Sequence, residues 1–463
     1  MLTKYDVIIV GAGPAGIFAA LELVKDGSEH KILMIEKGPG IKKRVCPSQN
    51  SSIGGCRHCS PCATVCGWGG AGAFSDGKLT LSTEVGGSLE EYVGVRELES
   101  LISYVDRLYL RFGAPDEVYG VKHQEEFEDI KRKAVLAGLR LVPLPIRHLG
   151  TGRCGEILQL MYEYLAPRVD IRTGTQVTRI VTKDNRAVGV ETADGQTYAG
   201  DYLVVAPGRE GSEWLAKEAR RLGLRTRVNP VDIGVRVELP AVVLEPLTNL
   251  FYELKCTYVS QTFEDRVRTF CMNPHGSVVM ENNDGVITVN GHSHAYQKTD
   301  NTNFAILVSK NFTEPFREPI AYGRYIASLA NLLGGNVIVQ RLGDLINGRR
   351  STPKKLKRCL VTPTLPEATP GDLSLVFPYR HMLGIIEMLK ALDKIAPGVY
   401  SRDTLLYGAE VKYYSSRLAL NEGLETPIAN LFAAGDGAGV TRGLVQASAS
   451  GVVVAREILK RLS

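Results

Sequence analysis

The chain has 463 residues, of which 44% are hydrophobic and 23% are charged, and this composition is ordinary for a folded globular protein. Its net charge of +5, from 55 basic and 50 acidic residues, is too small for this length to indicate a nucleic-acid-binding protein. No run approaches the roughly 18 consecutive apolar residues of a membrane span, and no secretory leader precedes the first strand-like run, so we expect a cytoplasmic protein without membrane partners.

The N-terminal segment has the pattern of a dinucleotide-binding unit. A strand-like run at Tyr5–Val10 leads into Gly11-Ala-Gly-Pro-Ala-Gly16 and then into an apolar, helix-like run to about Lys25. A second strand-like run, 31–35, ends at Glu36, 20 positions past the last glycine. The glycines allow a tight turn, close approach of a pyrophosphate to backbone, and close helix packing, while the acidic residue binds ribose hydroxyls. Glu36 would repel a 2′-phosphate, which favours FAD or NAD over NADP.

We expect the pyrophosphate to lie over the N-terminus of the first helix, where free N–H groups and the helix dipole favour negative charge. The cofactor-binding residues predicted in this segment are Gly11, Gly13, Pro14, Ala15, Gly16, Glu36 and Lys37.

Five of the nine cysteines lie between positions 46 and 66. Cys56-x-x-Cys59-x-x-Cys62-x-x-x-Cys66 has the spacing of bacterial ferredoxin ligands, although Gly67 stands where those proteins have proline. Clustered cysteines in a reducing compartment indicate ligands or redox groups rather than structural disulfides. Four interpretations stay open: a [4Fe–4S] centre with Cys46 as alternate ligand, a zinc site, a thiol–disulfide relay, or thiols without a ligand.

The following loop, Gly67–Lys78, has five glycines in twelve residues, which lets its backbone approach a flat or charged ligand. Trp68 and Phe74 favour burial, so a surface turn is the weaker interpretation. Gly150-Thr-Gly-Arg-Cys-Gly155 repeats the dinucleotide spacing, but Pro143 and Pro145 precede it in place of a strand. We expect a loop and a helix start there, and therefore no separate Rossmann domain for NAD(P)H.

The middle of the chain contains two sets of predicted strands. Residues 176–182, 187–192 and 197–206 form three short strands with turns between them, and the last ends in Val204-Val-Ala-Pro-Gly-Arg209. Residues 231–239 alternate strictly, which predicts a half-buried strand, and 286–290 and 304–308 add further strands. Helical patterns follow at 320–333 and 381–394. His275, His292 and His294 are the proton-transfer candidates here, with turn closure as the favoured alternative.

The C-terminal segment Leu431-Phe-Ala-Ala-Gly-Asp-Gly-Ala-Gly439 precedes a helix of small residues at 447–456. It resembles the Gly-Asp motif of the glutathione-reductase-like flavoproteins, and strand 197–206 resembles the strand that returns from their β-meander. The resemblance implies FAD rather than NAD, with Asp436 on the ribityl chain and a helix N-terminus directed at the flavin. The cofactor-binding residues that it implies are Val177, Ala206, Gly208, Gly435, Asp436, Gly443 and Leu444.

Four further segments are similar to the signatures of an uncharacterised family of FAD-dependent dehydrogenases: 67–79, 268–276, 289–293 and 410–414. The resemblance implies that the glycine-rich loop packs along FAD through Gly70, Ala71 and Ser75. Ser75, Asp76 and Lys78 would then reach the flavin edge. The predicted cations near the flavin are Lys78, Lys412 and Arg442, and the predicted catalytic residues are Lys78, His275 and Lys412.

We therefore predict an α/β protein with a discontinuous Rossmann-like FAD-binding domain that contains a β-meander, and a second α+β domain with an antiparallel sheet. The FAD-binding domain comprises 1–45, 150–211 and 401–463, a Cys- and Gly-rich loop and helical insertion comprises 46–149, and a substrate domain comprises 212–400. The predicted function is an FAD-dependent dehydrogenase or reductase acting on an organic small molecule, with NAD(P)H or a ferredoxin as electron partner. A flavin monooxygenase and a flavoprotein with structural or sensing FAD are the alternatives.

Overall fold

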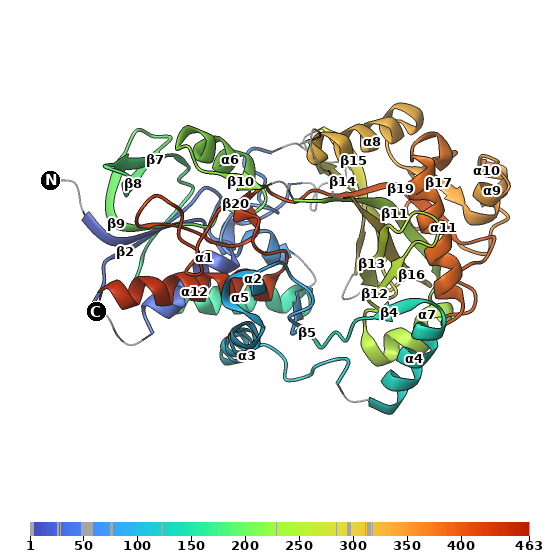
Figure 1. The fold of residues 1–463 in the computed structure, drawn as a ribbon, viewed down its shortest axis with the longest axis horizontal. Coiled ribbons are helices and arrows are strands. Elements are labelled where there is room, and N and C mark those ends of the chain that lie inside the picture. Colours follow the sequence, from blue (N-terminus) through green and yellow to red (C-terminus); the bar gives the residue numbers. More distant parts are fainter. Residues whose placement is uncertain are drawn as a thin grey trace. The chain divides into compact units, whose positions relative to one another are not determined.

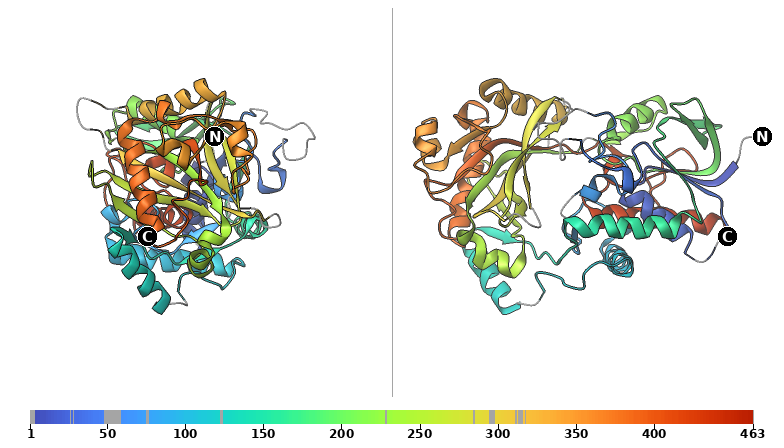
Figure 2. Two further views of the ribbon diagram at one scale, coloured as in Figure 1. Left: turned by 90° about the vertical axis from the view of Figure 1, so that its right-hand side faces the viewer. Right: turned by 180° about the vertical axis from the view of Figure 1, so that it is seen from behind.

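The computed structural model describes residues 4–462 except 26, 28, 48–58, 75–76, 122–123, 228, 284, 294–297, 311, 313–315 and 317. Cys56, Ser75, Asp76 and His294 of the predicted site lie outside the described residues. The chain divides into two compact units, drawn in Figures 1 and 2. Unit 1 contains Met1–Glu117, Arg147–Asn229 and Ser415–Ser463, and unit 2 contains Val118–Ile146 and Pro230–Tyr414.

Unit 1 is built on one mixed sheet with the strand order β6-β2-β1-β9-β8-β7, and β21 pairs with β9. The pairs β6–β2, β2–β1, β1–β9 and β9–β21 are parallel, whereas β7, β8 and β9 form an antiparallel meander. This confirms the predicted discontinuous Rossmann-like domain. The strands are β1 (Lys4–Val10), β2 (Ile32–Glu36), β6 (Asp170–Thr173), β7 (Val177–Lys183), β8 (Arg186–Thr192), β9 (Thr197–Val205) and β21 (Leu431–Ala433).

Two helices from opposite ends of the chain pack closely in unit 1. Figure 1 shows α12 (Leu444–Leu462) running beside α1 (Pro14–Leu23). A Cβ at Gly451 would lie 2.0 Å from the carbonyl oxygen of Ala15, so only glycine permits this approach. The remaining elements are α2 (Glu90–Val93), α3 (Val95–Arg111), α5 (Thr151–Leu165), α6 (Ser212–Arg221), the 3₁₀ turns η1 (Ile41–Lys43), η2 (Gly70–Phe74) and η4 (Asp436–Ala438), and the short strands β3 (Lys78–Thr80), β5 (Ile146–His148), β10 (Thr226–Arg227) and β20 (Arg417–Leu418).

Unit 2 is built on a second sheet with the order β18-β17-β19-β11-β16-β13-β12-β4, which is antiparallel except for β17–β18. A separate hairpin joins β14 and β15. The strands are β4 (Leu139–Leu141), β11 (Val231–Pro240), β12 (Cys256–Val259), β13 (Arg266–Asn273), β14 (Ser277–Asn283), β15 (Val286–His292), β16 (Asn301–Lys310), β17 (Ile338–Arg341), β18 (Thr369–Pro370) and β19 (Leu405–Lys412).

One face of the unit 2 sheet is the apolar core, because the odd positions of β11 from Val231 to Leu239 pack with residues of α7, α8 and α11. The helices are α4 (Gln124–Leu136), α7 (Ala241–Phe251), α8 (Pro319–Gly334), α9 (Leu342–Ile346), α10 (Pro353–Leu356) and α11 (Tyr379–Asp393), with the 3₁₀ turn η3 (Leu373–Leu375).

The prediction that residues 231–239 form a half-buried strand was wrong. Every residue of β11 up to Leu239 is buried, because β11 is a central strand whose even-numbered charged residues form ion pairs and hydrogen bonds inside the unit. The contact boundaries also differ from the predicted ones. Helix α6 belongs to unit 1, and β19 belongs to unit 2, where it lies between β11 and β17.

Among the described residues, none of the helices combines the length and the apolar character that crossing a bilayer requires.

Candidate functional site

The turn between β1 and α1 in unit 1 presents bare backbone. Gly11 has a φ of +104°, and a Cβ there would lie 2.2 Å from the carbonyl oxygen of Ala206. A Cβ at Gly16 would lie 1.9 Å from the carbonyl oxygen of Gly11, so that the helix can approach the turn. At Gly13 a Cβ would meet nothing closer than the Gly70 Cα at 4.0 Å, and no side chain caps α1. No side chain therefore covers this helix N-terminus, where the glycine spacing predicts that an anion binds.

Glu36, at the end of β2, is buried and has a second role that the sequence did not reveal. Its carboxylate accepts hydrogen bonds from the backbone N–H groups of Ala12 at 2.9 Å, Gly38 at 2.8 Å and Gly67 at 2.9 Å. A carboxylate offers about four acceptor positions, so it can hold these three segments together and still accept a hydroxyl. The next residue, Lys37, forms an ion pair with Glu210.

The glycine-rich loop is fastened to this turn. Trp68 is fully buried, and its indole N–H donates to the Leu158 carbonyl at 2.8 Å, which confirms the preference of Trp68 for burial. The Gly69 N–H donates to the Ala12 carbonyl at 2.7 Å. Within the following turn η2, Gly70 lies against Gly13, whereas a Cβ at Gly72 would lie 2.6 Å from Leu444 at the start of α12. Turn η2 thus lies between the N-termini of α1 and α12.

A buried guanidinium that the sequence analysis missed organises the same loop. Arg44 donates to the carbonyl oxygens of Ala63, Thr64, Trp68 and Gly70 at 2.7–2.9 Å. Its guanidinium carbon lies 4.9 Å from the centroid of the Phe74 ring. Since the bonds of Arg44 within the described part of the chain go only to main-chain oxygens, nothing in the loop sequence identifies it.

The Gly-Asp motif lies at the start of η4. One carboxylate oxygen of Asp436 accepts from the Thr441 hydroxyl at 2.8 Å, and the other pairs with Arg209 Nε at 3.0 Å. The Gly435 N–H donates to the Ser450 hydroxyl oxygen of α12 at 3.0 Å. At Gly208 a Cβ would meet nothing within 4 Å, and at Gly443 only the Gly86 Cα at 3.8 Å. Gly208 and Gly443 therefore also present bare backbone in unit 1.

The cysteine segment is described only in part. The thiols of Cys46, Cys59, Cys62 and Cys66 are free. Within the described ranges, no three His, Cys, Asp or Glu side chains come close enough to hold a metal ion. The Cys62 sulfur lies 2.9 Å from the Thr64 hydroxyl; burial opposes ionisation of Cys62, but hydrogen bonds from Thr64 keep its pKa below the usual value. Burial raises the pKa of Cys66 to about 12.

The second face of the unit 2 sheet is polar. We call this surface the polar face; it consists of Asp232, Arg236 and Glu238 of β11, Asn303 of β16, Arg268 and Phe270 of β13, and Glu410 and Lys412 of β19. Strand pairing places Asp232 beside Lys412, and Arg236 beside Ala305, which in turn pairs with Phe270. These residues come from two of the segments that resemble a dehydrogenase family, 268–276 and 410–414, and from β11 and β16.

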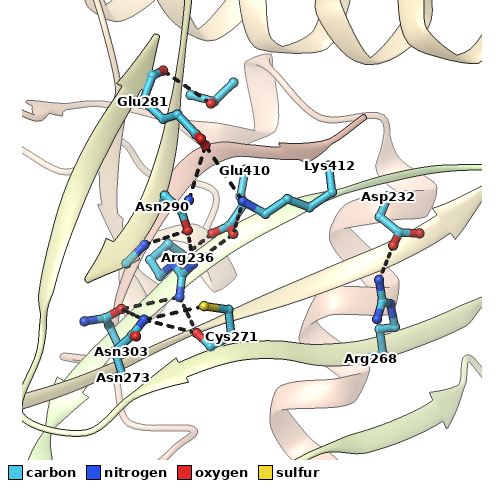
Figure 3. A network of polar contacts seen from close by, with 12 residues as sticks. Asp232, Arg236, Arg268, Cys271, Asn273, Glu281, Asn290, Asn303, Glu410 and Lys412 are labelled. Atoms are coloured by element: carbon cyan, nitrogen blue, oxygen red, sulfur yellow. Dashed lines mark hydrogen bonds and ion pairs between the residues drawn. The ribbon is translucent and has the colours of Figure 1, made fainter. Parts of the chain in front are cut away.

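A fully buried ion pair lies at the centre of the polar face (Figure 3). Arg236 and Glu410 are both 0% exposed, and the carboxylate is held by Arg236 Nε at 2.8 Å and Nη2 at 2.9 Å. The other guanidinium hydrogens donate to Asn290, Asn303 and the Cys271 carbonyl. The four hydrogens on Nη1 and Nη2 thus have acceptors, whereas Nε lies against Glu410 Oε2 without forming a hydrogen bond among the described residues, so this residue positions its neighbours.

The neighbouring residues Lys412 and Asp232 have different partners. Lys412 Nζ lies 3.2 Å from Glu410 Oε1. Asp232 accepts from Arg268, from the Ser309 hydroxyl at 2.6 Å and from the Tyr414 hydroxyl at 2.6 Å. Burial alone would raise the pKa of Asp232, but Arg268 and the two hydroxyls keep it below its usual value. Glu410 and Lys412 share a face, as predicted, and Tyr414 follows the end of β19.

Two of the predicted histidines of unit 2, His275 and His292, lie within the described residues, one in a turn and one at a strand end. His275 has a φ of +51°, and its Nδ1 lies 3.0 Å from the Thr299 carbonyl, while Nε2 is 3.6 Å from Glu245. This is the turn-closing arrangement that was the favoured alternative. His292 is the last residue of β15. The structure therefore brings Lys412, but not His275, into the polar face, and Lys78 lies in unit 1.

Comparisons with known proteins match both units. Residues 230–413 match the family described as “FAD-dependent protein, C-terminal domain-like”, and residues 104–232 match “Flavin containing amine oxidoreductase”. An uncharacterized protein of Clostridium beijerinckii is 27% identical over 488 residues, which cover 99% of this chain and 81% of that protein. Protein FixC of Escherichia coli is 26% identical over 252 residues, covering 52% of this chain and 45% of FixC.

Solved structures similar to this chain include the glycine oxidase from Geobacillus kaustophilus, with 15% identity, a TM-score of 0.41, and coverage of 99% of this chain and 95% of that one. The first family match, 230–413, coincides with the second segment of unit 2, Pro230–Tyr414, which contains most of the polar face.

Proposed function

We propose that this chain, which is an FAD-dependent oxidoreductase, is a dehydrogenase or reductase that holds FAD on the bare backbone of unit 1 and acts on an organic small molecule. The observation that supports the proposal most directly is the open N-terminus of α1 beside Gly13, with Glu36 at the end of the next strand. FAD supplies the electron transfer when bound, and the protein supplies binding, orientation and charge.

The residues of unit 1 divide this binding among them. The turn at Gly11, Gly13 and Gly16 would hold the pyrophosphate, and Glu36 would accept a ribose hydroxyl. Gly70 and Ala71 of η2 and Gly443 and Leu444 at the start of α12 would line the remainder of the cofactor. Asp436 is already bonded to Thr441 and Arg209, so it would bind the ribityl chain while keeping or exchanging the exposed Arg209 contact.

The test is the flavin content of the purified protein and its reduction. We expect one FAD per chain, released intact on denaturation, and bleaching of the flavin band under anaerobic titration with dithionite. Titrations with NADH, NADPH and a reduced ferredoxin then identify the donor. Oxygen consumption stimulated by substrate, with an oxygenated product, would replace the dehydrogenase proposal by a monooxygenase.

A pair of glycine variants separates cofactor binding from folding. Gly13→Val fills the space over α1, and we expect it to lose FAD while the apoprotein keeps its far-ultraviolet circular dichroism. Gly155→Ala, in α5, meets nothing within 4 Å and is the matched control that keeps full FAD content. If Gly13→Val binds FAD as the wild type does, the proposed binding of the pyrophosphate at Gly11, Gly13 and Gly16 is contradicted.

The proposal includes a cysteine-ligated centre as an electron relay, with Cys56, Cys59, Cys62 and Cys66 as ligands and Cys46 as the alternate. It is decided by iron and zinc analysis of anaerobically purified protein, where less than one iron atom per chain would remove the cluster. The eight described cysteines are all free, which supports a reducing compartment such as the cytoplasm; cell fractionation tests that location.

A further inference from the structure

On the polar face of unit 2, Lys412 lies beside the carboxylate of Glu410, which already forms an ion pair with Arg236. Glu410 is held at both oxygens by Arg236, and Lys412 Nζ approaches the same carboxylate at 3.2 Å. Two cations therefore share one buried negative charge. Figure 3 shows the Lys412 side chain directed at this carboxylate and toward Glu281.

The neighbouring carboxylates do not correct this imbalance. Glu281 Oε2 lies 4.0 Å from Lys412 Nζ, and its side chain is 46% exposed, so water screens it. Asp232 is bonded to Arg268, Ser309 and Tyr414. Glu238 accepts from the neutral groups of Asn301, Thr364 and Tyr407 and, among the described residues, forms no ion pair with Lys412. The surplus positive charge thus stays at Lys412.

Lys412 is also shielded from solvent. Its side chain is 11% exposed. A buried ammonium without its own counter-ion is costly, because desolvation is not repaid by an ion pair. Of the three ammonium hydrogens, the described residues provide one acceptor within hydrogen-bond distance, Glu410 Oε1. An anion bound beside Lys412 would balance the charge of its ammonium group and accept a hydrogen bond from a second ammonium hydrogen.

The surroundings of Lys412 contain an aromatic ring and further cations. The Phe270 ring centroid lies 4.8 Å from the Arg268 guanidinium, 5.4 Å from Lys255 Nζ and 6.0 Å from Lys412 Nζ. Gly234, which pairs with Glu410, admits no side chain, because a Cβ would lie 1.8 Å from the Ile306 carbonyl oxygen. Bare backbone therefore lies beside Glu410 at Gly234, and β16 separates β11 from the ring-bearing strand β13.

We infer that Lys412 binds a carboxylate of the substrate, with the apolar part of that substrate against Phe270, so that the substrate class is an organic acid. This inference rests on the proposed oxidoreductase function only in calling the bound acid a substrate. Arg236 positions Glu410 and, through it, Lys412.

The experiment is calorimetric titration of the FAD-loaded protein with benzoate, propionate and succinate, each paired with its neutral amide. We expect at least one carboxylate to bind and its amide not to bind. Lys412→Met should weaken that binding about tenfold or more, because a charge-assisted hydrogen bond is lost, and Lys412→Arg should recover part of it. Lys354→Met, on an exposed part of unit 2, is the control with unchanged binding.

The inference is overturned if none of the three carboxylates binds, or if Lys412→Met binds them as the wild type does. Dithionite reduction of the flavin in Lys412→Met separates the two proposals. A flavin that is reduced normally, together with lost carboxylate binding, supports both; a flavin that no donor reduces overturns the proposed oxidoreductase chemistry and leaves the titration to decide the anion site. Unfolding temperatures of all variants exclude a general loss of structure.

Discussion

In unit 1 the buried carboxylate of Glu36 accepts three backbone N–H groups, whereas in unit 2 the buried carboxylate of Glu410 is held by two cationic side chains. The first arrangement needs the main chain in the right place and one acid. The second needs several particular side chains from separate strands. We therefore expect unit 1 to tolerate loss of its ion pairs and unit 2 to be sensitive to such loss.

The largest effect is expected when the central pair of unit 2 is broken. Arg236→Met leaves Glu410 buried beside Lys412 alone and removes one of the two donors to each of Asn290 and Asn303. Removing one partner of a buried pair typically costs about 3–5 kcal/mol of unfolding free energy. Urea denaturation of the wild type and of Arg236→Met measures this difference in unfolding free energy.

A second variant shows whether the cost comes from the unpaired charge. In Arg236→Met/Glu410→Met both charges are gone, and we expect part of the lost stability to return because no carboxylate is left uncompensated. A loss below about 1 kcal/mol in the single variant would remove the contrast between the units.

The next largest effect is a pH dependence carried by His381 on α11. This side chain is buried, and neither ring nitrogen has a hydrogen-bond partner among the residues that the structure describes. Burial, with the positive charges of Lys310 and Arg380, lowers its pKa from 6.5 to about 4, although Asp265 opposes the shift. The unfolded chain binds a proton below pH 6.5 and the folded chain does not until about pH 4. Stability therefore falls between pH 6.5 and 4, by about 3 kcal/mol.

Denaturation midpoints at pH 7 and pH 4.5 test this dependence. We expect His381→Phe to lose most of the acid sensitivity, since no imidazole remains to be protonated. His275→Gln is the matched control, because that ring already lies against the Thr299 carbonyl and Glu245. Equal pH dependence in the wild type and His381→Phe would assign the acid sensitivity to other groups.

The same contrast explains what could be predicted from the sequence. In unit 1 the residues proposed to bind the pyrophosphate and the ribose lie close together in the sequence. Gly11, Gly13 and Gly16 lie within six residues, and Glu36 ends the next strand, so their spacing alone predicts the site. The meander and the Gly-Asp turn are local in the same sense. What spacing cannot show is that Glu36 also bonds the N–H of Gly67, which is 31 positions away.

The polar face of unit 2 is assembled from distant positions. Arg236 and Glu410 are 174 positions apart and meet only because β11 and β19 are neighbours in the sheet. The alternation of β11 predicts one exposed and one buried face, but opposite charges at Asp232 and Arg236 are also the pattern of a strand buried on both faces. The charged residues of alternating strands are thus the signal that could have indicated this network.

Arg44 sharpens the comparison, since it is a buried cation within unit 1. It donates only to carbonyl oxygens of the loop between Ala63 and Gly70. Arg44→Met should cost about 2 kcal/mol, because buried carbonyls lose a charged donor, and should weaken FAD binding by loosening η2. Equilibrium dialysis of FAD and urea denaturation measure the two effects. Arg44→Lys, which keeps the charge but not the four-way geometry, should recover little of either.

The smallest effect is expected at the pair between Arg209 and Asp436 in unit 1. Arg209 is 54% exposed, so water and salt screen its attraction to the carboxylate, and such pairs contribute under about 1 kcal/mol. Arg209→Ala should therefore change the unfolding free energy little and keep FAD bound, since Asp436 retains the Thr441 hydroxyl. Urea denaturation of the wild type and of Arg209→Ala in low and high salt checks this expectation. A loss of unfolding free energy as large as that of Arg236→Met would mean that the stability of unit 1 also depends on its side-chain charges. The two units would then differ only in how far apart their interacting residues lie in the sequence.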